Sequence, residues 1–411
     1  MAIVKPFPAI RPRPDLAPRV CELPYDVMSS DEARQIASGN PLSFLHVSKP
    51  EIDLPPGTDP YSPAVYAQGR DNFSRLLREG VLRPDPQPCF YLYRQTMGAH
   101  TQTGLVALAS CEEYLANGVK KHELTRVDKE DDRVRHIETL GAQTGPAFLA
   151  YRAEPALDQF VLDRTTGIPA VDFVAADRVR HTAWVIDAPE DLRFVATAFS
   201  RLPCLYIADG HHRTAAAGRI HRSRQGSGGS DGFLAVIFPH DQLQILPYHR
   251  LVKDLNGHAP ESLRAKLATV FDVVSPGTPQ PARKQELGFY LAGQWWTLRF
   301  KDALTQGANG ADRLDVALLQ RHVLAPLFGI DNPRTSERVS FVGGIRGPGE
   351  LERLVDSGAW AAGFSLFPTG IEDLMSIADA GEIMPPKSTW FEPKLRDAMF
   401  CHQLGTATEA S

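Results

Sequence analysis

The stretch YIADGHHRTAAAG, residues 206–218, constrains the fold more than any other part of the sequence. An apolar run ends in Asp-Gly and is followed by three polar residues and then by alanines. This order predicts a buried strand, a tight turn and a helix that packs close to its sheet. The first turn of a helix has unpaired N–H groups and the positive end of the helix dipole. Because His211, His212 and Arg213 stand at that turn, the stretch predicts a binding site for phosphate or a carboxylate.

Two interpretations of this turn are open on the sequence alone. In the first, Gly210 allows close approach of the backbone to an anion, and the guanidinium of Arg213 supplies a cation. In the second, Asp209 caps an ordinary helix and the two histidines are solvated. Two adjacent histidines beside an arginine at the end of a strand favour the anion site.

Size and charge limit the class of protein. A chain of 411 residues with 43% hydrophobic residues can bury a large core, which we expect to be divided among two or three lobes. The formal net charge of -5 provides no general basic field, which argues against a nucleic-acid partner held by its phosphates.

Cysteine usage and the N-terminal stretch bear on the compartment. The five cysteines are widely spaced and form no CxxC pair, so they predict neither a disulfide framework nor a thiolate zinc site. The proline-rich stretch MAIVKPFPAIRPRP lacks the apolar region of a signal peptide, and no run approaches the roughly 18 apolar residues of a membrane span. We therefore expect a cytoplasmic protein with reduced thiols and without a membrane partner.

Strands and helices alternate irregularly along the chain, which predicts a mixed α/β (α+β) fold. The runs CFYLYRQT and TGLVALAS predict a hairpin, and apolar periodicity predicts helices over 31–38, 63–80, 189–201, 260–271 and 314–330. We expect three parts, namely an N-terminal α+β lobe over 1–170, a strand–loop–helix core over 171–255 and a C-terminal α/β lobe over 256–400.

A second polar cluster lies in KKHELTRVDKEDDR, residues 120–133. Glu123 stands between a histidine and a nearby threonine, while Lys129 and Arg133 follow at a spacing that allows a return to the same pocket. The cluster predicts a general base or a ligand for a metal ion that bridges phosphates. A solvated charged face is the alternative. The stretch is not the zinc-protease motif HExxH, because Arg126 stands where the second histidine would be.

A segment that follows two prolines carries Lys387, Ser388, Thr389 and Lys394 around the aromatic pair Trp390-Phe391. It lacks the glycines of a P-loop, so its KST is not a Walker motif. The sequence allows two interpretations of this segment, a structural turn or a lysine that faces a ligand.

A series of motifs in a fixed order resembles one protein family. The motifs are PYDV, NPLSFLHVSKPEID, KKHELT followed by KEDDR, YIADGHHR, LPYHRLV, LDVALLQRHVLAPLFGI and DAGEIMPPKSTWFEPKL. Together they resemble the prokaryotic family catalogued as domain of unknown function 1015, over about Lys5 to Leu395.

The DGHHR box alone carries a second, more distant resemblance. It is similar to the box of the free serine kinases in the ParB/sulfiredoxin-like superfamily, in which the loop and the helix start hold nucleotide phosphates. The resemblance implies a catalytic position beside the transferred group, or its Mg²⁺, for Asp209, and a catalytic role for His212. It implies ATP or ADP phosphate contacts from Gly210, His211, His212, Arg213 and Thr214.

The glutamate of those kinases has no matching motif here. Glu123 is our candidate for that catalytic role, and with Asp209 for the metal ligands, because it lies in the only other cluster that combines an acid with histidine. Arg133 and Lys129 would join Arg213 in neutralising phosphate charge.

These observations predict a Mg²⁺-dependent small-molecule phosphotransferase, of which a kinase for serine or a similar hydroxy amino acid is the leading case. One alternative is a nucleotide-binding regulatory or switch protein without turnover. Another is a metal-dependent phosphohydrolase with the ligands His122, Glu123, Asp209, His211 and His212. The sequence does not separate the nucleotide, the acceptor or the direction of the reaction.

Overall fold

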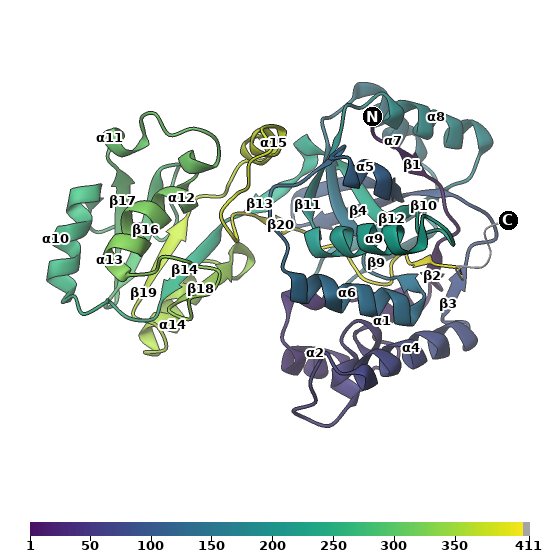
Figure 1. Ribbon diagram of the computed structural model, residues 1–411, viewed down its shortest axis with the longest axis horizontal. Helices are drawn as coiled ribbons and strands as arrows, with labels where there is room; N and C mark the ends of the chain where they lie inside the picture. The colour runs from purple at the N-terminus through teal and green to yellow at the C-terminus, as the bar shows by residue number, and fades with distance from the viewer. Residues whose placement is uncertain (406–411) are drawn as a thin grey trace. The chain divides into compact units, whose positions relative to one another are not determined.

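The structure is a computed structural model that describes residues 1–405. The chain folds into two compact units. Unit 1 contains Met1–Leu243 and the segment that begins at Pro393, and unit 2 contains Gln244–Glu392 (Figure 1). Each unit has its own sheet, and the mixed α/β fold that the sequence predicts is confirmed.

Unit 1 is built on a nine-stranded sheet with the order β6-β11-β8-β12-β5-β4-β10-β9, to which β1 adds by pairing with β5. The strand β11 runs parallel to β6 and β12 runs parallel to β8, while the other pairs are antiparallel. The strands are β1 Val4–Lys5, β4 Phe90–Met97, β5 His100–Ser110, β6 Val119–Lys120, β8 Ala147–Tyr151, β9 Val171–Val174, β10 Arg180–Ile186, β11 Leu205–Asp209 and β12 Gly232–Pro239.

The helices of unit 1 bury apolar faces against this sheet and against one another. They are α1 Ala17–Val20, α2 Ser30–Ala37, α3 Leu45–Ser48, α4 Pro63–Arg78, α5 Cys111–Leu115, α6 Val127–Leu140, α7 Pro155–Arg164, α8 Pro189–Ser200 and α9 His211–Arg224. The alanines of α9 are buried, as the sequence predicts, and a Cβ at Gly218 would lie 3.0 Å from the Tyr114 ring of α5. Small residues thus allow α9 to lie close to its neighbours.

The segment after Pro393 returns to unit 1 and crosses it as an extended chain (yellow in Figure 1). The N–H of Cys401 donates to the carbonyl of Ile10 at 2.9 Å, and β21 His402–Gln403 pairs with β7 Ala142–Gln143. Its apolar side chains, including Met399 and Phe400, are fully buried.

The boundaries of these units follow long-range strand pairing. The large sheet takes strands from both sides of residue 170, and the change of unit lies at residue 243, with a second change at 393. A division at 170 and 255, expected from the local pattern of strands and helices, does not coincide with these positions, because a local pattern carries no information on which distant strands pair.

Unit 2 is an antiparallel six-stranded sheet with the order β15-β17-β16-β19-β14-β18 and a separate pair, β13 with β20. The strands are β13 Gln244–Leu246, β14 Tyr248–Val252, β15 Phe271–Val274, β16 Glu286–Leu291, β17 Gln294–Phe300, β18 Val339–Gly343, β19 Ala362–Leu366 and β20 Trp390–Glu392. Its longer helices are α10 Pro260–Val270, α14 Gly349–Asp356 and α15 Ile371–Asp379.

The helix predicted over 314–330 is divided into three pieces. The α-helices Asp315–Leu319 and Ala325–Phe328 flank a π-helical turn over Gln320–Leu324. Pro326 lacks the N–H that a continuous α-helix needs, which accounts for the altered hydrogen bonding just before it.

The segment with Lys387, Ser388 and Thr389 forms a turn in unit 2, where the Ser388 hydroxyl donates to the carbonyl of Pro385 at 2.7 Å. Within residues 1–405, none of the helices combines the length and the apolar character needed to cross a bilayer.

Candidate functional site

The predicted strand, turn and helix are present at the DGHHR box. The strand β11 ends at Asp209, Gly210 adopts a φ of 90°, and α9 begins at His211. A Cβ on Gly210 would lie 3.3 Å from the Cα of Ala147 on β8, so both the backbone angle and the space favour glycine. Gly210, the N-cap residue, has no side chain that could cap α9, which favours an anion as the partner of the first N–H groups.

The carboxylate of Asp209 is held at both oxygens. Its Oδ1 accepts the N–H of Gly210 at 2.8 Å, and its Oδ2 accepts Nζ of Lys394 at 2.8 Å. Burial alone would raise the pKa of Asp209, but the positive charges of Lys394 and Arg213 hold that pKa well below its usual range. Asp209 is therefore ionised near neutral pH, as a ligand for the metal ion that accompanies a phosphate would need to be.

Two histidines and Glu123 meet beside the first turn of α9. His122, Glu123 and His211 each offer a nitrogen or a carboxylate oxygen, and these atoms all lie within 4.8 Å of one another. The rings of His122 and His211 are perpendicular, with centroids 4.5 Å apart. Burial lowers the pKa of His122 to about 4 and holds the pKa of His211 well below its usual value, so both rings are neutral at pH 7.

The stretch that carries His122 and Glu123 is thus not merely a solvated face. His122 is 2% exposed and Glu123 is half-buried, whereas Leu124 is exposed. The structure places His122 and Glu123 close to His211 of the DGHHR box.

Three other predicted residues have partners in the protein. His212 accepts the N–H of Arg126 at its Nε2, at 3.1 Å. The hydroxyl of Thr214 donates to the carbonyl of Gly210 at 3.1 Å, inside the helix, and Nζ of Lys129 donates to the hydroxyl of Tyr61 at 2.6 Å. His212 therefore fixes the loop at Arg126, and Lys129 lies at a site other than the pocket described next.

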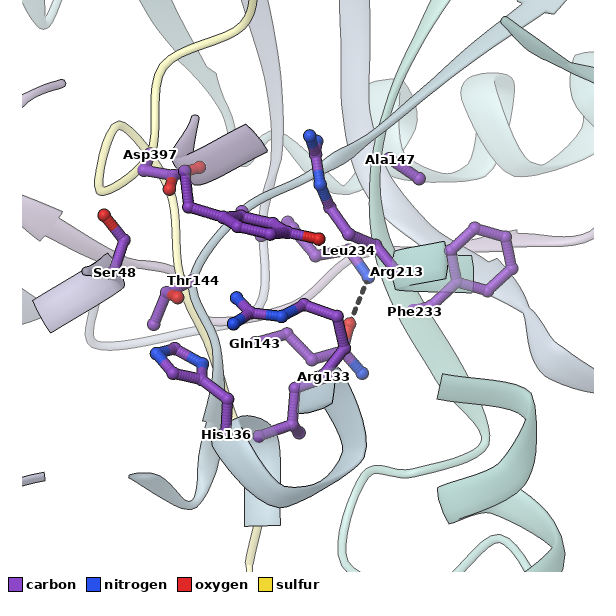
Figure 2. A pocket seen from close by; sticks show the side chains of 13 residues that line it. Ser48, Arg133, His136, Gln143, Thr144, Ala147, Arg213, Phe233, Leu234 and Asp397 are labelled. Carbon is purple, nitrogen blue, oxygen red and sulfur yellow. Dashed lines mark hydrogen bonds between the residues drawn. The ribbon is translucent and has the colours of Figure 1, made fainter. Parts of the chain in front are cut away.

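Arg213 and Arg133, which the sequence placed in one site, line the same small pocket (Figure 2). Arg213 donates from Nη1 to the carbonyl of Pro146 at 2.7 Å and from Nη2 to Asp26 at 3.2 Å. The guanidinium of Arg133 lies 3.8 Å from the centroid of the Tyr25 ring, a cation–π contact. Two guanidinium groups at one pocket suit an anionic ligand.

Asp397 also lines this pocket, from the segment that begins at Pro393 (Figure 2). It is 3% exposed. Burial raises the pKa of Asp397 to about 7. The positive charge of Arg213 lowers this pKa, and the negative charge of Asp26 raises it. The charge of Asp397 therefore changes near neutral pH, and with it the charge of the pocket.

The sequence offered Lys394 only as one of two lysines, with Lys387, that could face a ligand, and it did not point to Asp397. The signal that could have found them is a group of charged residues inside a largely apolar stretch, since WFEPKLRDAMF places Lys394, Arg396 and Asp397 among side chains that are buried. A buried charge is retained only where it has a partner or a function. Asp26 and Tyr25 lie in PYDV, which entered only as one of the family motifs.

Comparison with solved structures finds distant likenesses. A free serine kinase in complex with AMP is 14% identical to the chain, with 70% of this chain and 89% of that chain covered and a TM-score of 0.39. SbnI with a C-terminal truncation, from Staphylococcus aureus, is 10% identical, with 74% and 90% covered and a TM-score of 0.41. A conserved hypothetical protein from Pyrococcus furiosus is 14% identical, with 68% and 90% covered and a TM-score of 0.34.

Comparison with curated protein sequences finds no match. A family model does match, over residues 4–317, which is more than half of the chain. Its description is a protein of unknown function, DUF1015. The residues matched include the 120–133 stretch and the DGHHR box, and the chain belongs to this family.

Proposed function

We propose that this protein is a phosphotransferase that binds ATP or ADP at the start of α9 and transfers a phosphoryl group to a small hydroxy amino acid such as serine. One observation carries the proposal. The helix α9 begins directly after a glycine with positive φ, and an ionised carboxylate and a buried arginine stand at its first turn. Such a turn favours a phosphate by its N–H groups and its dipole.

In this proposal the nucleotide phosphates contact the backbone of the loop and the side chains at the pocket. Gly210 permits close approach, and the N–H groups from His211 onward donate to phosphate oxygens. Arg213 and Arg133 neutralise the negative charge, a task in which a planar guanidinium binds two oxygens at once. Phosphoryl transfer depends mostly on such alignment and charge neutralisation.

Two carboxylates complete the proposed site. Glu123 acts on the hydroxyl of the acceptor, and Asp209 is the ligand offered to Mg²⁺ that accompanies the nucleotide. The donor chemistry of Asp209 fits Mg²⁺, which prefers carboxylate oxygens, although Nζ of Lys394 occupies one oxygen and must share it. Bound Mg²⁺ would supply charge neutralisation between phosphate oxygens. His212 holds the Arg126 loop, and with it Glu123, close to α9.

The test is transfer of labelled phosphate from ATP or ADP to a panel of hydroxy amino acids, with release of inorganic phosphate followed in parallel. Glu123→Gln should keep nucleotide affinity and lower transfer by on the order of 100-fold or more, the usual scale for loss of acid–base help. Glu112→Gln, at an exposed position on α5, is the matched control and should transfer at the wild-type rate.

The products separate the alternatives. Labelled acceptor that forms only when the acceptor is supplied supports the proposal. Release of phosphate without any acceptor would instead indicate a phosphohydrolase, and tight nucleotide binding without either product would indicate a regulatory nucleotide-binding protein. Transfer by Glu123→Gln at the wild-type rate would remove Glu123 from the reaction.

A further inference from the structure

The group formed by His122, Glu123 and His211 has features that an ordinary buried histidine pair lacks. Nδ1 of His122 and Nε2 of His211 are both inaccessible to solvent, and neither has a hydrogen-bond partner among residues 1–405. A buried polar atom without a partner costs about 1–3 kcal/mol, so native proteins rarely keep two of them side by side. One nitrogen of each histidine and one carboxylate oxygen of Glu123 all lie within 4.8 Å of one another.

The other nitrogen of His122 is already engaged. The His122 ring hydrogen-bonds to the backbone of Ile207 on β11, and since Nδ1 has no partner, Nε2 makes this bond. A backbone carbonyl that accepts from one nitrogen fixes the tautomer and leaves a lone pair on the other. This is the arrangement in which metal-binding histidines are usually held.

Charge favours a cation at this position. The carboxylate of Glu123 belongs to the group, and Asp209 ends β11 two residues before His211. These charges oppose the positive end of α9, which begins at His211. The segment that carries His122 reaches α9 through the bond between His212 and Arg126, which holds both halves of the group together.

From these observations we propose that His122, Glu123 and His211 bind a divalent transition-metal ion of the zinc class. Two imidazole nitrogens and one carboxylate are ligands that Zn²⁺, Co²⁺ and similar ions prefer, whereas Mg²⁺ prefers oxygen ligands alone. In a tetrahedral site with bonds near 2.1 Å, ligand atoms are about 3.4 Å apart. Metal binding would bring the three ligand atoms to this spacing by rotation of the Glu123 side chain and a small shift of the two imidazole rings.

Three protein ligands leave one coordination position open, as in catalytic zinc sites. Because His211 is the first residue of α9, a water or hydroxyl bound to the metal at this turn would become more acidic. The proposal goes beyond phosphoryl transfer from a nucleotide, because the site would exist in a protein of any of the three functional classes.

The experiment is a titration of the chelator-treated full-length protein with Co²⁺, followed by visible absorption, and with Zn²⁺ in competition. No nucleotide or acceptor is present, so the result is independent of the transfer assay. We expect one equivalent of Co²⁺, displaced by Zn²⁺. His211→Gln and Glu123→Gln should each bind at least on the order of 100-fold more weakly, because loss of a ligand costs no less than loss of an outer-sphere partner.

A matched control is His221→Gln, on the same helix, because Nδ1 of His221 lies 3.2 Å from the carbonyl of Ser230 and outside the group. It should bind Co²⁺ as the wild type does. X-ray absorption of the wild-type zinc form, which needs no variant, should show two imidazole ligands. The proposal is overturned if the wild type binds no ion at one-to-one stoichiometry, if the spectrum shows oxygen ligands only, or if folded His211→Gln binds as tightly as the wild type.

Discussion

Arg213 combines a structural contact with the proposed anion contact. Its Nη atoms hold Pro146 and Asp26, and its buried Nε has no partner among the described residues. Arg213→Ala should weaken ATP or ADP binding by roughly 1.5–3 kcal/mol, or about 10- to 150-fold, because a charge-assisted contact is lost. Isothermal titration calorimetry measures this change.

The matched control for Arg213→Ala is Arg135→Ala, which removes an exposed arginine on α6. It should leave nucleotide affinity unchanged. Because Arg213 also ties two loops together, the circular dichroism spectrum of each variant must match the wild type before affinities are compared. Wild-type affinity in a folded Arg213→Ala variant would exclude the arginine from phosphate binding.

Asp397 should make stability depend on pH. Its pKa is about 7 in the folded protein and near 3.9 for an unperturbed side chain. Between these two pH values the Asp397 carboxyl is protonated in the folded state and ionised in the unfolded state. The contribution of Asp397 to the free energy of unfolding therefore falls as the pH rises, and it stays constant above about pH 7. Asp397→Asn should therefore gain stability relative to the wild type between about pH 5 and about pH 8, measured by urea unfolding.

The control for this pH series is Asp59→Asn, at an exposed position before α4. Its stability relative to the wild type should not change across the same range. A constant difference between Asp397→Asn and the wild type would mean that the charge of Asp397 does not change on folding.

At the scale of elements, the turn between β11 and α9 depends on glycine. Gly210→Ala forces a side chain into a φ of 90° and brings Cβ to 3.3 Å from the Cα of Ala147. The backbone angle alone costs roughly 1–2 kcal/mol. Gly98→Ala separates the two effects, because Gly98 has a φ of 59° but no atom within 4 Å of the added Cβ. Urea unfolding should show a larger loss for Gly210→Ala, and calorimetry should show weaker nucleotide binding only for that variant. Equal losses of stability in the two variants would mean that Ala147 moves aside without a cost in free energy.

Elements with a clear local pattern could be predicted from the sequence. The strand, turn and helix at the DGHHR box, the β4–β5 hairpin and α4 follow from apolar periodicity and turn residues within short windows. Lys394 could not be assigned in this way, since it lies 185 residues from Asp209 and meets it only through tertiary folding. His122 was among the ligands of the phosphohydrolase alternative, but its burial could not be predicted, because a charge-rich stretch gives no period that marks one of its residues as buried.

At the scale of the whole molecule, unit 2 is an excursion between two parts of unit 1. Gln244 pairs with Glu392, so the chain leaves unit 1 and returns to it at neighbouring positions. Replacement of residues 247–389 by an Asn-Gly turn should therefore leave unit 1 folded and able to bind nucleotide, with β13 and β20 joined as a hairpin. Circular dichroism and calorimetry test this. A shortened chain that fails to fold would show that unit 1 depends on unit 2.

The complementary variant is a chain that stops after Glu392. It lacks Lys394, the partner of Asp209, and the buried side chains Met399 and Phe400. Loss of two large buried side chains alone should cost several kcal/mol, on the scale of about 2–5 kcal/mol for each. We expect this chain to be unfolded or to unfold at much lower urea concentration. Wild-type stability would mean that the returning segment is dispensable.

The return of the chain to unit 1 also sets an order for biosynthesis. Domains generally fold as units while the ribosome is still elongating the chain. Unit 2 is complete once residue 392 has emerged, but unit 1, although started first, waits for the residues after Pro393. Until then Asp209 has no Lys394, the core lacks Phe400, and a partly open unit 1 is exposed to chaperones and proteases. The candidate site is thus completed only after the whole of unit 2 has been translated.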